Sequence, residues 1–141
     1  MAEGEPERAL ELDLPAVPES CPEARSWVRD VLVAVAVDQG AIDLAVSEAV
    51  NNAVVHAYRD RARTDEPGRV RVAVVVDDDG LWVTVSDEGG GMAPRTDSPG
   101  LGLGLPLMTQ SSDELEIDQM ARGTRVRMRF GVRSDAGAAV R

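Results

Sequence analysis

A glutamate and an asparagine one helical turn apart are the first residues whose types and spacing could do chemistry. Glu48 and Asn52 lie in the segment 42–58, whose apolar residues recur at intervals of three and four and predict an amphipathic helix. Side chains four positions apart share one face of a helix, so the carboxylate and the amide would lie together among small alanines. The amide oxygen of Asn52 could bind Mg²⁺, and Glu48 could accept a proton or orient a water. A solvated helix face, with the two side chains hydrogen-bonded to each other, is the alternative.

A carboxylate beside glycines is the second candidate. Asp87 follows a β-rich segment directly and precedes the glycines 89–91. A carboxylate at a strand end can accept hydrogen bonds from an exocyclic amine, and glycines let a flat ring approach the backbone closely. A turn with an aspartate cap would use the same residues.

A stretch of alternating glycine and leucine, residues 99–105, is the third candidate. It precedes a predicted helix, where backbone amides can bind an anion without a basic side chain. Its glycine spacing does not give the dinucleotide-binding pattern GxGxxG. A glycine-rich connector is the alternative.

The elements that position these residues form a two-layer α/β sandwich in our prediction. Because most of the expected strands fall into hairpins, we expect a mixed, mostly antiparallel sheet with helices on one face. The pattern of Ser20–Glu23 is typical of a capping box and predicts a first helix from there to about Val37. Strands are expected over 9–14, 70–76, 81–86, 114–118 and 124–130, a second helix over 42–58, and a third from about 105 to 112.

Composition limits the function. All 15 basic residues are Arg, so a Walker-A phosphate loop and lysine Schiff-base chemistry are both excluded. The net charge of −10 argues against a nucleic-acid partner. A single Cys excludes an internal disulfide, and no apolar run approaches the ~20 residues of a membrane span. The acidic start is unlike a secretory signal, so the expected location is the cytoplasm.

The three candidate segments, in this order, resemble the GHKL-type (Bergerat) ATP-binding fold. EAVNNAVVHAY (48–58) is similar to the N box of that family, DEGGG (87–91) to its first glycine box, and GLGLGLPLM (100–108) to its second. GTRVRMRF (123–130) looks like its last strand. The details are similar to one branch, the anti-sigma-factor serine/threonine kinases. The resemblance covers about residues 9–131, the expected single domain, with 1–8 and 132–141 as flexible tails.

The resemblance implies a role for each matching residue. Asn52 would coordinate Mg²⁺ and Glu48 would be the general base. Asp87 would bind the adenine amino group of ATP. The other implied ATP contacts are Gly89 and Gly91 at the adenine, Gly102, Leu103 and Gly104 around the phosphates, and Thr124 near the adenine.

The resemblance leaves two hypotheses, a kinase and an ATP-binding module without phosphate transfer, and two features of the sequence distinguish them. The segment 92–101 corresponds to the ATP lid and is short, which favours a module that binds ATP without transferring phosphate. The intact pair of Glu48 and Asn52 favours a kinase that phosphorylates a serine or threonine of an anti-anti-sigma factor. Arg95 is the one basic residue of the lid and could contact a phosphate, or could be a solvated loop residue.

Protein partners are implied as well. The branch implies that the chain sequesters a sigma factor and can form a homodimer. Arg25 and Arg29, four apart in the first predicted helix, would contact a partner, or would form a solubilising face. His56 is expected to be structural.

Overall fold

Five strands and three helices make up the part of the chain that the computed structural model describes, residues 8–60, 68–78, 80–88, 104–120 and 123–132. The strands form one sheet in the order β1-β2-β3-β5-β4, and each neighbouring pair is antiparallel. The elements are β1 (Arg8–Pro15), α1 (Ser20–Val31), α2 (Gln39–Asp60), β2 (Arg69–Asp77), β3 (Gly80–Asp87), α3 (Gly104–Ser111), β4 (Glu114–Gln119) and β5 (Thr124–Phe130). The predicted two-layer sandwich is confirmed, with a fully antiparallel sheet in the described residues.

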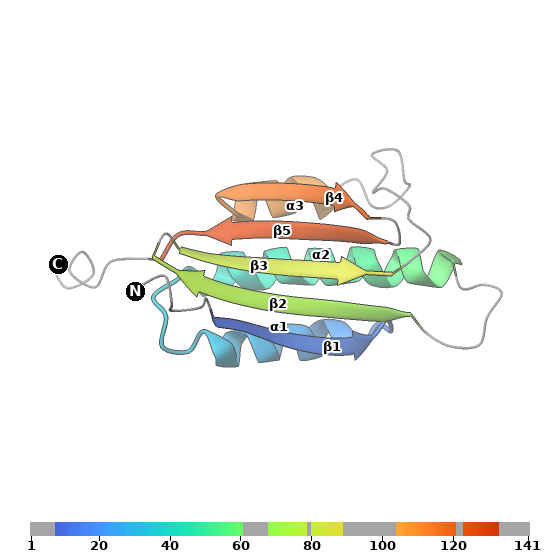
Figure 1. Cartoon of the computed structure of the whole chain (residues 1–141), viewed down its shortest axis with the longest axis horizontal. Coiled ribbons are helices and arrows are strands. Elements are labelled where there is room, and N and C mark those ends of the chain that lie inside the picture. The colour runs from blue at the N-terminus through green and yellow to red at the C-terminus, as the bar shows by residue number, and fades with distance from the viewer. Residues whose placement is uncertain (1–7, 61–67, 79, 89–103, 121–122, 133–141) are drawn as a thin grey trace, which may run out of the picture.

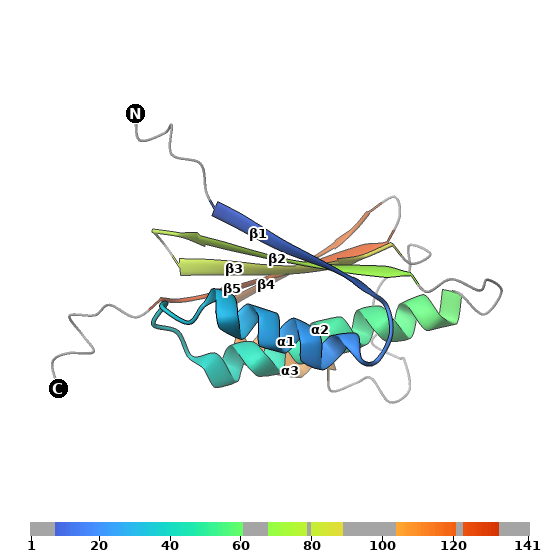
Figure 2. The same ribbon diagram turned by 90° about the horizontal axis from the view of Figure 1, so that it is seen from below.

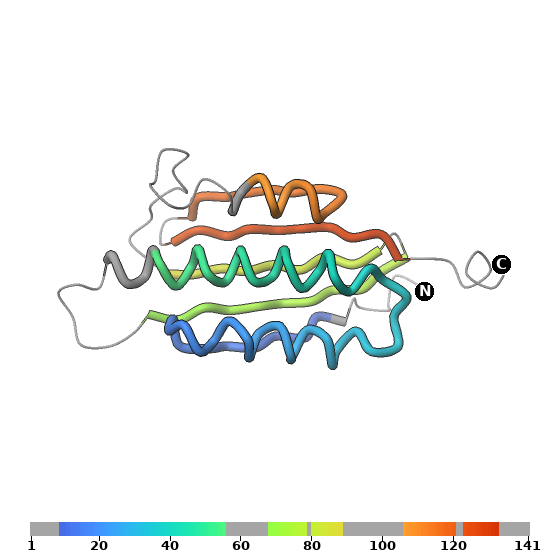
Figure 3. Tube along the Cα trace, turned by 180° about the vertical axis from the view of Figure 1, so that it is seen from behind, coloured from blue at the N-terminus to red at the C-terminus, as the bar shows by residue number. Residues whose placement is uncertain are grey.

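The three helices lie side by side on one face of the sheet. Figure 2 shows the sheet and the helices as two separate layers, and Figure 3 shows α2 between α1 and α3. α2 packs against both of these helices and against β3. The other face of the sheet, which we call the open face, is covered by no helix in the described ranges (Figure 2).

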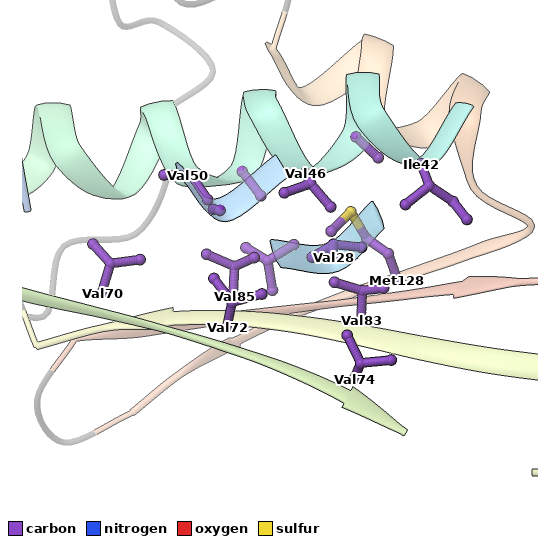
Figure 4. Close-up of a cluster of buried hydrophobic side chains, with 14 of the residues drawn as sticks. Val28, Ile42, Val46, Val50, Val70, Val72, Val74, Val83, Val85 and Met128 are labelled. Carbon is purple, nitrogen blue, oxygen red and sulfur yellow. The ribbon is translucent and has the colours of Figure 1, made fainter. Parts of the chain in front are cut away.

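Alternation along the strands determines which side chains enter the core. In β3 and β5 every second residue is buried against the helices, as expected for an antiparallel sheet with one covered face. The core between the two layers consists mainly of Val, Leu, Ala and Ile, and Figure 4 shows the valines of β2 and β3 below α2. Phe130 is its one aromatic residue among the fully described positions.

The start of α1 differs from the predicted capping box. Glu19, not Ser20, is the N-cap residue, and no side chain caps the helix. The hydroxyl of Ser20 instead donates a hydrogen bond of 2.6 Å to the carbonyl oxygen of Pro15. Ser20 is buried at 1% exposure, so this bond joins the start of α1 to the end of β1.

The end of α1 also differs, because the helix stops at Val31 rather than near Val37. Val35 and Val37 still pack against the core, but from the connection that follows the helix. The spacing of the apolar residues therefore predicted the burial of Val35 and Val37 correctly but predicted too long a helix. A run of β-branched residues has low helix propensity, which favours this early end. α2 then begins at Gln39, with the Asp38 carboxylate accepting a hydrogen bond from the backbone N–H of Ala41 at 3.1 Å.

Candidate functional site

Glu48 and Asn52 lie on the flank of α2 that faces away from α1. α1 contacts the opposite flank, through ion-pair and hydrogen-bond contacts to Asp43 and Ser47. At about 100° per residue, Glu48 and Asn52 lie roughly 100–180° around the helix from these two contacts. That direction points to the side of α2 on which α3 packs (Figure 3). Both Glu48 and Asn52 are half-buried, so neither occupies a simple solvated face.

Asp87 is the last residue of β3 and is only 9% exposed. It continues the alternation of Leu81, Val83 and Val85, so its side chain is on the helix-covered face of the sheet. Asp87 makes a polar interaction within the protein. A carboxylate on the covered side of a strand end suits recognition of a flat polar ring.

Thr124 begins β5, the strand next to β3, and is 4% exposed. The β3–β5 register pairs Ser86 with Arg125, so Thr124 lies at the same end of the sheet as Asp87. Gly123, just before Thr124, has a φ of +91°. A Cβ atom built on Gly123 would lie 1.8 Å from the carbonyl oxygen of Asp87, so no side chain fits there. The two strand ends are therefore in close backbone contact.

The elements that carry the four predicted residues all extend to one end of the sheet. Figure 1 shows the later part of α2, the end of β3 and the start of β5 toward this end. In Figure 4 Val50 of α2 lies over Val85 and Val70, and Val85 precedes Asp87 by two residues. Glu48 and Asn52 lie on either side of Val50 in the sequence but about 160° around the helix from it, so they do not share its sheet-facing side.

Several predicted ligand contacts lie outside the described residues. These are Gly89, Gly91, Gly102 and Leu103, together with Arg95 of the lid segment. Gly104 is the first residue of α3, as expected for a glycine at a helix start. The backbone of His56 lies within α2, and its side chain is outside the described part.

The predicted partner contacts Arg25 and Arg29 join α1 to α2. A guanidinium nitrogen of Arg25 donates to the hydroxyl of Ser47 at 3.1 Å and lies 3.7 Å from the sulfur of Cys21. Arg29 forms an ion pair with Asp43. The side chain of Arg29 is still 58% exposed, so it remains accessible to a partner while it is paired. Its role in partner binding stays a prediction.

The oxygen ligands of the candidate site suit Mg²⁺ bound together with a nucleotide better than Mg²⁺ bound by the protein alone. Among the described residues no three His, Cys, Asp or Glu side chains gather as a metal site. An isolated divalent cation usually needs several oxygen ligands, whereas Mg²⁺ bound with a nucleotide takes most of them from phosphates and water. Asn52, as a single neutral oxygen ligand, suits the second case. Asp87 and Thr124 offer polar groups for a base at the adjoining strand ends.

Of two cavities lined by described residues, one is too small for a nucleotide and the other lies away from the predicted site. One cavity of about 80 Å³ lies beside Asp87 on the open face, with Arg71 and Ser86 in its lining. It is too small for a nucleotide, since ligand pockets measure about 300–1,000 Å³. Another of about 300 Å³ is lined by Asp38 and Phe130 at the opposite end of the sheet. The nucleotide site proposed below is therefore argued from its side chains.

Sequence reasoning did not identify Asp43 and Ser47 as the anchors for Arg29 and Arg25. Both residues lie on one flank of α2, four positions apart, opposite to Glu48 and Asn52. A helix with one apolar stripe and two different polar flanks indicates two different neighbours. That signal is present in the sequence and could have predicted a helix contact on one flank and a site on the other.

None of the helices described here is both long enough and apolar enough to cross a bilayer. The family model for the histidine kinase-like ATPase domain matches residues 14–130, nearly the whole described structure. This match confirms the GHKL-type family that the motifs predicted.

Curated relatives carry the name anti-sigma F factor. The chain is 33% identical over 97 residues to the protein of Clostridium beijerinckii, covering 60% of this chain and 65% of the relative. It is 31% identical over 99 residues to the protein of Bacillus subtilis, covering 62% and 65%. The aligned part thus spans about 65% of the length of these relatives.

A solved structure has the same fold. It contains the RsbU and RsbW domains of Rv1364c from Mycobacterium tuberculosis, and it matches with a TM-score of 0.67 and 26% identity. The match covers 92% of this chain and 34% of that one. The family model and the shared fold together show that the chain belongs to the histidine kinase-like ATPase family of the GHKL type.

Proposed function

We propose that this protein is an ATP-binding anti-sigma factor that phosphorylates a serine or threonine of an anti-anti-sigma partner. The observation that carries the proposal is the half-buried pair of Glu48 and Asn52, one turn apart on the flank of α2 that faces away from α1, in a fold that also buries Asp87 and Thr124 at adjoining strand ends. A binding module without chemistry has no need of a half-buried carboxylate one turn from the metal-binding amide. The anti-sigma F factors among its relatives support the choice of partners.

Each residue has a distinct task in this proposal. The carboxylate of Asp87 accepts a hydrogen bond from the adenine amino group, and Thr124 adds a polar contact beside it. Asn52 gives its amide oxygen to Mg²⁺. ATP with Mg²⁺ supplies the phosphoryl group and neutralises the charge that develops as it is transferred. Since the chain has no Lys, the backbone amides of Gly102, Leu103 and Gly104 bind the phosphates instead.

Glu48 accepts the proton of the attacking hydroxyl. Its half-buried position on α2 holds the carboxylate in one direction, which a surface side chain would not achieve. General-base catalysis of this kind contributes about 10²–10⁴-fold to a rate. Phosphorylation of the partner would add about two negative charges to it and weaken its hold on this acidic protein, so the sigma factor stays bound here.

Nucleotide binding is tested first by thermal unfolding with ATP. We expect the melting temperature to rise with ATP and to rise further when Mg²⁺ is added, because a ligand that binds the folded state stabilises it. Asn52→Ala should remove the Mg²⁺-dependent part of the shift. Asn51→Ala is the matched control, because Asn51 is the exposed neighbouring asparagine on α2. Absence of any shift at millimolar ATP would exclude the proposal.

Phosphate transfer is tested with ATP labelled at the γ-phosphate and any candidate anti-anti-sigma protein that is encoded beside this chain. Glu48→Gln should reduce transfer by about 10²–10⁴-fold while the ATP-dependent rise in melting temperature remains. If the wild-type protein binds ATP and transfers nothing, the kinase part is wrong and the chain is an ATP-dependent interaction module. The short segment 92–101 is the feature that favours this second outcome.

A further inference from the structure

A second cavity lies at the end of the sheet opposite to the predicted nucleotide site. It measures about 300 Å³, which is the lower limit of the usual range for small-ligand pockets. The start of α2, the end of α3, the start of β4 and the end of β5 meet around it, and Figure 1 shows α2, β4 and β5 at this end. We call it the far-end pocket, and its lining includes Asp38, Ala41, Ser111, Asp113, Phe130 and Val132.

Two carboxylates of the far-end pocket are held in place by backbone groups. The Oδ1 atom of Asp38 accepts a hydrogen bond of 3.1 Å from the backbone N–H of Ala41. The Oδ2 atom of Asp113 accepts one of 2.8 Å from the backbone N–H of Gly131. Within the described part of the chain, no other hydrogen bond reaches either carboxylate. The second oxygen of each is therefore open to a ligand, and its direction is set before the ligand arrives.

The negative charge of the far-end pocket exceeds the positive charge beside it. Arg129 lies 3.9 Å from Asp113, but it also lies 3.7 Å from Glu114, so one guanidinium serves two carboxylates. Asp38 forms no ion pair with any of the described residues. The chain as a whole already has a net charge of −10. A cation is therefore the ligand whose charge complements this pocket.

The rest of the far-end pocket is mostly apolar. Ala41, Phe130 and Val132 line it, and Ser111 supplies its one uncharged polar side chain. Val132 is 39% exposed, although it is one of the larger apolar residues of the described chain. A metal ion would make no use of this apolar wall. A ligand that uses both parts of the pocket carries a cationic head on an aliphatic stem, as the side chain of arginine does.

We propose that the far-end pocket binds an organic cation, a guanidinium group on an aliphatic stem. The head pairs with Asp38 and Asp113, and the stem lies against Phe130 and Val132. A guanidinium is favoured over an ammonium because its planar donors match carboxylates in pairs and because it is less strongly hydrated. The group belongs either to a small molecule or to an arginine of a peptide, and the chemistry recognised is the same. This inference goes beyond the proposed function and does not depend on it.

Titration with butylguanidinium, followed through the amide signals of the isotope-labelled chain by NMR, tests the site. We expect saturable shifts at Ala41, Ser111 and Gly131, which line the pocket, and none at Thr124, at the other end of the sheet. A ligand this small makes few contacts, so its dissociation constant should be about 1 mM. Butylurea is the matched probe of similar shape without the charge, and guanidinium chloride is the probe without the stem. Each should bind at least about 10-fold more weakly.

Two substitutions remove the charges and keep the hydrogen bonds that position them. In Asp38→Asn and Asp113→Asn the side-chain amide oxygen can still accept from the backbone N–H, so the local structure is retained. Each should raise the dissociation constant of butylguanidinium by about 10-fold, because one charge-assisted contact is lost. Asp78→Asn is the matched control, since Asp78 is exposed in the turn between β2 and β3 at the same end of the sheet, outside the pocket lining. It should bind like the wild type.

A blocked glycine–arginine–glycine peptide distinguishes the two sources of the guanidinium. Tighter binding of the peptide than of butylguanidinium identifies an arginine of a protein as the occupant, and weaker binding identifies a free small cation. Both results support the site. The inference is overturned if the pocket amides do not shift, if butylurea binds as tightly as butylguanidinium, or if the Asp38 and Asp113 variants bind like Asp78→Asn. Shifts that spread over the acidic surface without saturation would overturn it too.

Discussion

Replacement of Gly123 by alanine tests the close contact between the two strand ends of the nucleotide site. A Cβ atom at position 123 would lie 1.8 Å from the carbonyl oxygen of Asp87 and 2.8 Å from the Cα of Glu88. Real Cβ atoms essentially never approach another heavy atom within 3.0 Å, so the segments would have to separate by at least about 1.2 Å, the difference between the two distances. The atoms in the way belong to the backbone, which cannot rotate aside as a side chain could.

Two costs add in this variant. An alanine held at a φ of +91° costs about 1–2 kcal/mol, and the separation of two paired backbones costs about 1–2 kcal/mol more. We therefore expect Gly123→Ala to lower the free energy of unfolding by about 2–4 kcal/mol. In the proposed site, the same movement displaces Asp87 from the adenine of ATP. Loss of a hydrogen bond to a charged group weakens binding by about 10- to 100-fold.

Urea unfolding measures the first effect, and calorimetric titration with ATP on the folded variant measures the second. Gly40→Ala is the control, because its Cβ would make only an ordinary contact of 3.6 Å with Asp38 in the first turn of α2. It should be as stable as the wild type, or more stable by up to about 1 kcal/mol. If Gly123→Ala unfolds at the wild-type urea concentration and binds ATP with wild-type affinity, the close-contact argument is refuted.

Three substitutions test the packing elsewhere, each by the urea midpoint of unfolding. Leu81→Ala should cost about 2–5 kcal/mol because Leu81 is fully buried, whereas Leu10→Ala, at 50% exposure, should cost under about 1 kcal/mol; equal costs would contradict the assigned core. Ser20→Ala should lower the free energy of unfolding by about 1–2 kcal/mol, since it removes the hydrogen bond between α1 and β1. Ser20→Gly removes the same hydrogen bond and should be at least as unstable if that bond is the cause. Arg29→Ala should cost at most about 1 kcal/mol at low salt, and the loss should shrink in high salt, because its ion pair with Asp43 is partly exposed.

The strands could be predicted closely because one face of the sheet is covered and the other is not. Apolar and polar residues therefore alternate, and the bounds of β5 (Thr124–Phe130) agree with the prediction in full. α1 was predicted too long because Val35 and Val37 lie in the connection after the helix and are still packed against the core. In the sequence, the spacing of such buried residues resembles that of an amphipathic helix. The capping box at Ser20 failed for a tertiary reason, since the hydroxyl bonds to β1 instead of its own helix.

The site could be predicted only where its residues lie on regular elements. The shared face of Glu48 and Asn52 follows from helix geometry alone. The element that packs on that side of α2 is determined by the position of α1. The periodicity of one helix does not predict this position. The close approach of Gly123 to Asp87 joins positions 36 residues apart in the sequence, and no local pattern marks such a contact.

The adjacency of β3 and β5 has a consequence for how this protein can change over evolution. The chain leaves β3 after Asp87 and reaches the neighbouring strand β5 at Thr124, so the residues between them, with α3 and the edge strand β4, form one insertion that begins and ends at the proposed nucleotide site. The closure of a longer loop costs little, about 0.6 kcal/mol for each doubling of length. Insertions and deletions after Glu88 can therefore accumulate without disturbing the pairing of β1, β2, β3 and β5. The sheet and α2 can therefore stay constant in related proteins while the segment between β3 and α3 varies in length.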